Sequence, residues 1–153
     1  MISDEFVRQM KDRVDFQPVC PEMEIGLGCP RDPIRVVSAG GELRLMQPTT
    51  GRDVTREMRA FAAAFLGGLG PVEGFLLKSR SPSCGIKDVK VFATADADEP
   101  CGVGAGFFAS AVLERFPDTA IEDESRLQNP SLCEHFLTRI FTMAEFRSGR
   151  RGG

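Results

Sequence analysis

Short apolar runs alternate with longer amphipathic segments along most of the chain, and this alternation limits the folds that it can adopt. A short apolar run bounded by glycine or proline is typical of a buried strand, whereas apolar residues spaced three or four apart are typical of a helix. Strands that alternate with helices favour a sheet with helices on its faces. We therefore predict a three-layer α/β/α sandwich of the Rossmann-like kind with a mostly parallel sheet. The predicted strands are residues 16–19, 34–37, 42–46, 74–77, 89–92 and 119–122.

Four helices are predicted from the spacing of apolar residues and from capping residues at their ends. Ser3, Asp53 and Asn129 are the expected N-caps of the first, second and fourth helix, because their side-chain oxygens can accept a bond from a free backbone N–H. The segments 34–37 and 42–46 are expected to form a hairpin. The predicted helices are residues 3–14, the segment from Asp53 to Leu69, residues 107–116 and a last helix that begins at Pro130.

The size and charge of the chain favour a single soluble domain. Its 153 residues are 42% hydrophobic and 27% charged, with a net charge of -3. This balance gives no reason to expect duplex nucleic acid as a partner. No apolar run approaches the roughly 20 residues of a membrane span, and no signal peptide is recognisable. We expect a cytoplasmic domain over residues 1–146, followed by a flexible basic tail at residues 147–153.

Five cysteines, an odd number with no C-x-x-C pair, argue against a disulfide framework and against a zinc ribbon. The single histidine, His135, lies within the last predicted helix, so it is a poor candidate for a catalytic triad. The stretch Cys101–Phe107 is rich in glycine, but Phe107 stands where a dinucleotide fingerprint requires glycine. These glycines are expected to open the third helix instead.

Two loops with thiols follow predicted strands. Ser79–Gly85 contains three serines and Cys84, and it comes directly after the strand 74–77 and Lys78. Cys20–Arg31 follows the strand 16–19 and contains prolines, glycines and carboxylates. Ligands of open α/β sheets gather beyond the carboxyl ends of strands, which makes both loops candidates for chemistry. The alternative is that both are ordinary solvated turns, because serine, proline and glycine are common turn residues.

Three motifs in these loops and between them follow one another in a fixed order. They are Cys20-Pro21-Glu22 with Gly26-Leu27 and Pro30-Arg31, then Gly51-x-Asp53-Val54-Thr55, and then Lys78-Ser79-x-Ser81-Pro82-Ser83-Cys84-Gly85. Together they resemble the thiouracil desulfidase family (TudS and YbbK-like proteins), also catalogued as domain of unknown function number 523. Gly104, Phe108-Ala109, Glu122 and the run Glu124-x-Arg126-Leu127 agree with the same family, and the resemblance extends over roughly residues 5–146.

The resemblance implies a 4Fe-4S cluster that is held by three cysteines and leaves one iron open. Thiolates suit iron–sulfur clusters, and an open iron can accept a soft sulfur atom from a substrate. Cys20 and Cys84 match two of the three ligands. The implied reaction is the non-redox hydrolysis of a C–S bond in thiolated pyrimidines such as thiouracil.

The same resemblance implies roles for the polar residues of the two loops. Glu22 matches the acid that moves protons while water attacks, and Ser81 and Ser83 match hydroxyl groups that orient the heterocycle. Lys78 and Ser79 are expected to contact the substrate. The expected partner is a small thio-heterocycle, and a fused or associated C-terminal domain is a further expectation from the family.

The chain departs from the family at its N-terminus. The first cysteine of the family lies on an N-terminal strand, but no thiol precedes Cys20 here. We expect either a truncated sequence, whose sheet lacks its first strand, or a divergent member. Cys29 and Cys101 are the substitutes considered for the third ligand. Two other hypotheses stay open: a binding or interaction module without the cluster, and a cluster-free enzyme that uses Cys84 as a nucleophile.

Overall fold

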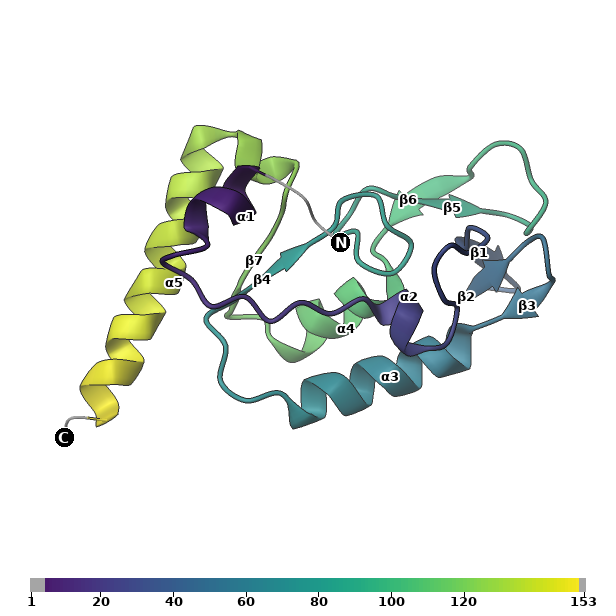
Figure 1. Ribbon diagram of the computed structural model, residues 1–153. Helices are drawn as coiled ribbons and strands as arrows, with labels where there is room; N and C mark the ends of the chain where they lie inside the picture. The colour runs from purple at the N-terminus through teal and green to yellow at the C-terminus, as the bar shows by residue number, and fades with distance from the viewer. Residues whose placement is uncertain (1–4, 152–153) are drawn as a thin grey trace.

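The computed structural model describes residues 5–151, so the predicted N-cap Ser3 lies outside the described part (Figure 1). Most predicted helices and strands are present, with ends that shift by a few residues. The helices are α1 (Glu5–Met10), α2 (Pro21–Glu24), α3 (Thr55–Gly68), α4 (Phe107–Arg115) and α5 (Pro130–Arg151), with a 3-10 turn at Arg126–Gln128. The strands are β1 (Arg35–Ala39), β2 (Glu42–Gln47), β3 (Arg52–Asp53), β4 (Gly74–Leu77), β5 (Val89–Phe92), β6 (Gly102–Gly104) and β7 (Ala120–Asp123).

The predicted hairpin is confirmed, and its turn explains the direction of its strands. β1 and β2 pair antiparallel through the turn Gly40-Gly41. Both glycines have positive φ angles, 59° and 84°, as a tight two-residue hairpin turn requires. A side chain at either position would be strained, so the sequence itself determines this turn.

The predicted mostly parallel, Rossmann-like three-layer sandwich is wrong. The larger sheet has the strand order β3-β2-β1-β5-β6, and within it only β1 and β5 pair in parallel. β6 returns antiparallel to β5 because the connection, residues 93–101, is shorter than the dozen or so residues that a parallel crossover needs. The protein is a small α/β domain with a mixed sheet.

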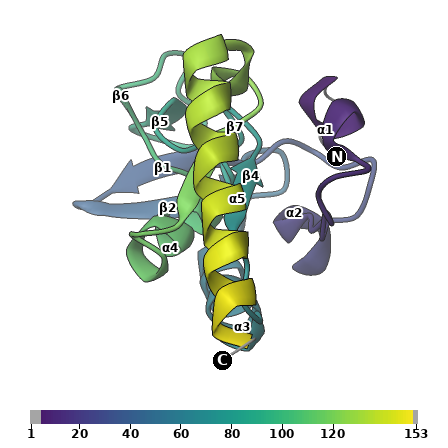
Figure 2. The same cartoon turned by 90° about the vertical axis from the view of Figure 1, so that its left-hand side faces the viewer.

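The other two strands form a parallel pair of their own. β4 and β7 make a two-stranded sheet with Gly74 opposite Ala120 and Leu77 opposite Asp123. Figure 2 shows α5 lying across this pair, where Phe136 and Ile140 join a small apolar cluster with residues of α1. Since parallel strands end on the same side, the loops after β4 and β7 start next to each other.

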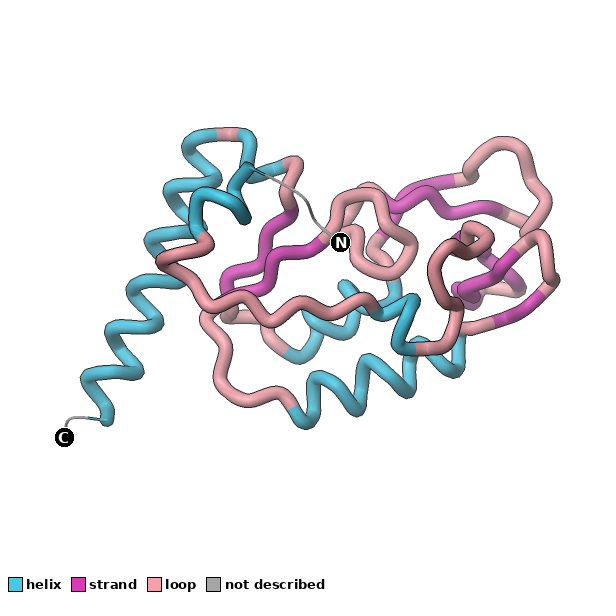
Figure 3. The backbone as a smooth tube through the Cα atoms, viewed as in Figure 1, coloured by secondary structure: helices cyan, strands magenta, loops and turns pink. Residues whose placement is uncertain are grey.

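The predicted strand at residues 16–19 is also wrong. Residues 15–20 have no strand assignment, and Figure 3 shows them as loop between α1 and α2. The Cys20 loop is therefore placed by α2 and by its own side-chain contacts instead of by a sheet.

The main core lies between the larger sheet and the helices α3 and α4. Met58 of α3 and Phe108 of α4 are almost completely buried there, together with Val36 and Leu45 of the hairpin. The Phe61 ring stacks on that of Phe108 with centroids 6.0 Å apart. This packing fixes α4, and the N-terminal end of α4 is hydrogen-bonded to the Ser79–Gly85 loop. No helix within residues 5–151 is both long and apolar enough to cross a membrane.

Candidate active site

The two thiol loops, which are far apart in sequence, meet in the structure. Ser83 of the Ser79–Gly85 loop donates from Oγ to Oε1 of Glu22 over 3.2 Å. Ser83 is buried, with 2% of its surface exposed. The structure thus brings together the residues predicted for the cluster and for proton transfer: Cys20, Glu22, Ser81, Ser83 and Cys84.

The N-terminal end of α4 holds the Cys84 loop in place. The backbone N–H groups of Phe108 and Ala109 donate to the carbonyl of Ser83 over 2.8 and 3.0 Å, and that of Phe107 donates to the carbonyl of Pro82 over 3.1 Å. These are N–H groups of the first helical turn, which have no partner within their own helix. A dinucleotide phosphate bound after the glycine-rich stretch Cys101–Phe107 would need the same N–H donors, and these are already bonded to the Cys84 loop.

Close backbone approach explains the glycine before α4. Gly106 donates its N–H to the carbonyl of Gly85 over 2.8 Å. A Cβ at Gly106 would lie 2.5 Å from the carbonyl carbon of Ser83. Only glycine fits this approach, so the Gly-rich stretch serves the Cys84 loop.

Hydroxyl groups order the interior of the Cys84 loop. Ser81 Oγ accepts from the backbone N–H of Cys84 over 3.1 Å and lies 3.0 Å from Ser83 Oγ. Ser83 Oγ in turn lies 3.7 Å from Cys84 Sγ. A connected row of polar atoms therefore runs from the thiol of Cys84 to the carboxylate of Glu22.

The Cys20 loop is organised by α2 and by Arg31. The carbonyl of Cys20 accepts from the backbone N–H groups of Met23 and Glu24 over 3.1 and 3.0 Å. Pro21 suits the first helical position, where no N–H partner is needed. Arg31 then returns to Glu22, whose Oε2 atom is 2.6 Å from its Nη2. Arg31 belongs to the first of the three sequence motifs, but no role for it can be read from the sequence alone.

Lys78 and Ser79 lie at the start of the Cys84 loop and contact Glu124. Ser79 donates both its hydroxyl, over 2.6 Å, and its backbone N–H, over 2.9 Å, to this carboxylate. Lys78 Nζ is 3.5 Å from it, with 56% of the lysine side chain exposed. Burial acts to raise the pKa of Glu124, but the bonds from Ser79, a backbone bond of Glu124 itself and the charge of Lys78 together outweigh it, so the pKa is lowered. Glu124 was matched to the family by sequence, and only the parallel pairing of β4 with β7 reveals its contact.

Burial dominates the chemistry of Cys84 in the free chain. It raises the pKa of the Cys84 thiol to about 11, with the nearby charges of Glu22 and Cys20 adding to the effect and Ser83 opposing it. At neutral pH the side chain is therefore a thiol and a weak nucleophile. This counts against a cluster-free enzyme with Cys84 as its nucleophile. A metal ligand would be deprotonated by the metal instead.

The ligand set for a metal is incomplete in the part of the chain that the structure describes. All five cysteines lie in that part and are free thiols. Among residues 5–151, no three histidine, cysteine, aspartate or glutamate side chains are grouped so as to hold a metal ion. Cys29 and Cys101, the substitutes considered for a third ligand, are exposed. Thiols are the right kind of ligand for an iron–sulfur cluster. The two loops, however, supply only two of them, Cys20 and Cys84, and not the three that the family resemblance implies.

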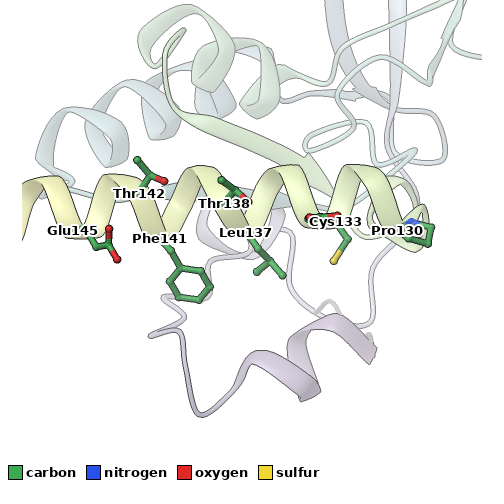
Figure 4. A pocket seen from close by; sticks show the side chains of 8 residues that line it. Pro130, Cys133, Leu137, Thr138, Phe141, Thr142 and Glu145 are labelled. Carbon is green, nitrogen blue, oxygen red and sulfur yellow. The ribbon is translucent and has the colours of Figure 1, made fainter.

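A shallow hollow lies elsewhere, along α5. Figure 4 shows its lining side chains along α5, with Cys133, Leu137 and Phe141 projecting from the same side of the helix. None of the residues of the two thiol loops lines it. We therefore place the candidate active site at the two loops and not at this hollow.

The protein is a mixed α/β domain in which two loops bring together two thiols, a carboxylate and two hydroxyl groups. Comparison with known proteins assigns a domain of this kind to a family. The family model of the 2-thiouracil desulfurases matches residues 1–124, most of the chain. The chain belongs to this family.

A solved structure of a 4Fe-4S-dependent thiouracil desulfidase, TudS, has the same fold. It superposes with a TM-score of 0.62 at 26% sequence identity, covering 90% of this chain and 84% of that one. No curated protein matches the chain.

Proposed function

We propose that the protein is a thiouracil desulfidase in which water replaces the sulfur of a thiocarbonyl group. The reaction balances as C=S plus water giving C=O plus hydrogen sulfide, without a net change of oxidation state. Membership of the 2-thiouracil desulfurase family supports the substrate class, and the likeness to the TudS structure supports the cofactor. A small thiolated pyrimidine is the expected partner. Neither match supports a fused or associated C-terminal domain.

One observation carries this proposal: the contact of 3.2 Å between Ser83 and Glu22. It joins two loops separated by about sixty residues, each with a cysteine next to the contact. An ordinary solvated turn would have no reason to bury a serine against a carboxylate, because a buried polar group needs a partner. The convergence of thiols, hydroxyls and a carboxylate is what a desulfidase site requires.

Cys20 and Cys84 are the residues of this chain that would hold a 4Fe-4S cluster, the group on which the enzyme of the matching structure depends. When bound, such a cluster supplies a Lewis acid that attracts the soft sulfur atom of a thiocarbonyl group. Cys20 lies two residues before Glu22, and Cys84 directly follows Ser83, so each thiol is next in sequence to one partner of the Ser83–Glu22 contact. The identity of a third ligand is not part of the proposal.

Glu22 is the proposed general acid and base. Its side chain is 13% exposed, close enough to solvent to meet a water molecule and sheltered enough to orient it. Ser81 and Ser83 supply hydroxyl groups next to Glu22, and we assign them the orientation of the heterocycle. Lys78 and Ser79 are proposed to contact the substrate at the edge of the site, from a position fixed by Glu124.

The cytoplasm is the proposed compartment, because five free thiols suit a reducing environment. We also propose that residues 1–146 form the single catalytic domain and that residues 147–153 are a basic extension, of which residues up to 151 continue α5.

Turnover of 2-thiouracil by anaerobically reconstituted protein tests the proposal. We expect uracil and sulfide in equal amounts without added reductant. Glu22→Gln should lower kcat roughly 100-fold or more, because a general acid and base contributes about that much. Glu24→Gln on the same short helix is the matched control, since Glu24 is exposed and should leave kcat unchanged. Reconstituted protein that releases no uracil would contradict the proposal.

A binding module without catalysis is the second candidate, favoured by the incomplete set of metal ligands within residues 5–151. It predicts that 2-thiouracil binds to the protein, as measured by isothermal titration calorimetry, while no uracil forms under the same anaerobic conditions. Release of uracil together with bound iron rules it out.

A further inference from the structure

Arg31 connects the parts of the Cys20 loop through three of its nitrogen atoms. Nε and Nη2 contact the same carboxylate oxygen of Glu22, Oε2, over 2.8 and 2.6 Å. Nη1 donates to the carbonyl of Gly28 over 2.7 Å, and Nη2 lies 3.8 Å from Cys20 Sγ. The side chain is 23% exposed, so water competes little with these bonds.

The two oxygens of Glu22 therefore have different partners. Oε2 is taken by the forked guanidinium of Arg31, while Oε1 faces Ser83. A carboxylate on a freely rotating side chain would exchange its two oxygens and sample several directions. Two donors of the rigid, planar guanidinium converge on Oε2, which holds this oxygen in place in a way that the single point charge of a lysine does not.

The bond from Arg31 Nη1 to the carbonyl of Gly28 holds the guanidinium group of Arg31 in place. Gly28 has a φ angle of +74°, so the loop turns sharply here and places its carbonyl toward the guanidinium. Arg31 thus spans the loop from Gly28 to Glu22, and its donors are directed at the protein. This arrangement does not suit a residue whose main task is to bind substrate.

We propose that Arg31 is a positioning residue that orients Glu22 toward Ser83, an inference that rests on the proposed desulfidase function. Arg31 acts through Glu22: it keeps one carboxylate oxygen occupied and leaves the other directed at the hydroxyl of Ser83. Supporting groups of this kind typically contribute 10- to 100-fold to activity.

A double-mutant cycle with Glu22 tests the inference in the reconstituted full chain. Arg31→Met should lower kcat by roughly 10- to 100-fold while KM changes less than about threefold. In the Glu22→Gln background, Arg31→Met should cause no further loss beyond about twofold, because its target is already gone. Arg31→Lys should resemble Arg31→Met, since charge without the fork does not fix the carboxylate. Iron content should stay at the wild-type value in all these variants.

Arg44 offers a matched control. Its Nε and Nη2 contact one oxygen of Asp53 over 2.9 and 2.7 Å, the same forked geometry, between β2 and β3. Arg44→Met should leave kcat unchanged. Equal losses in Arg31→Met and Arg44→Met, or an undiminished loss in the Glu22→Gln background, would overturn the role of Arg31 while leaving the desulfidase function intact. A wild-type protein without turnover would overturn the function, and the positioning role with it.

Discussion

At the scale of single residues, the site is defined by how buried groups are paired. Ser83 is buried and satisfied by Glu22, Ser81 and the backbone of α4, and the described side chains leave no buried polar atom without a partner. Leaving a buried polar group unpaired costs about 1–3 kcal/mol, so this network favours one arrangement of the two loops. The residues of this network are among those that the sequence proposes for the site, and their pairing follows from the tertiary structure.

The thiol of Cys84 gives a prediction at this scale. Its raised pKa means that the folded chain without metal keeps it protonated at neutral pH, and that reactivity increases as the pH rises toward about 11. We expect iodoacetamide to modify Cys84 at pH 7.5 roughly 10- to 100-fold more slowly than the exposed Cys101, as measured by mass spectrometry of the digested protein. Equal rates for the two cysteines would contradict the raised pKa of the Cys84 thiol.

Arg31 and Glu124 show why part of the site was not assigned from sequence. Both residues occur in motifs that were recognised, but each acts on a partner that only the fold identifies. Glu124 reaches Ser79 because β4 and β7 are neighbours, although the two residues are 45 positions apart. No local pattern contains that information.

At the scale of elements, α4 and the Cys84 loop act as one unit. The first N–H groups of α4 bond to loop carbonyls, and Gly106 allows the two backbones to approach. Helix dipoles favour this arrangement, because carbonyl oxygens carry partial negative charge next to the positive end of the helix.

Gly106→Ala tests this unit. The new Cβ would lie 2.5 Å and 2.6 Å from the carbonyl carbon and oxygen of Ser83, which are backbone atoms and cannot rotate away. We expect a loss of about 1–3 kcal/mol in the free energy of unfolding, measured by urea denaturation, together with reduced iron binding. The control is Gly102→Ala, where nothing lies within 4 Å of the new Cβ. A Gly106→Ala variant as stable as the wild type would contradict the close approach.

Turn and capping residues in the sequence predicted individual helices and turns better than they predicted the direction in which the strands of the sheet pair. The Gly40-Gly41 turn and the cap at Asn129 are set by neighbouring residues, and both are present. Asp53 does accept the N–H of Thr55, although the helix begins two residues after it. Strand direction depends on connection length and on partners far away in the chain, and there the prediction of a mostly parallel sheet failed.

At the scale of the whole molecule, the fold brings two loops from different parts of the chain to one place. The Cys84 loop is held by β4 and α4, whereas the Cys20 loop is supported by α2 and by Arg31 and has no strand behind it. The resemblance found in the sequence is confirmed by the family match and by the solved structure with a TM-score of 0.62. The two thiol loops meet at one network, in which Ser83 contacts both Glu22 and Cys84.

The central claim is that Cys20 and Cys84 belong to one iron–sulfur site. Its most direct test is the iron and acid-labile sulfide content of the anaerobically reconstituted protein, together with its visible absorption. We predict bound iron and sulfide in the wild type and in Cys133→Ser, whose thiol lies on α5 away from the site, and their loss in both Cys20→Ser and Cys84→Ser. A colourless, iron-free wild-type protein, or a Cys84→Ser variant that keeps its iron, would contradict the claim.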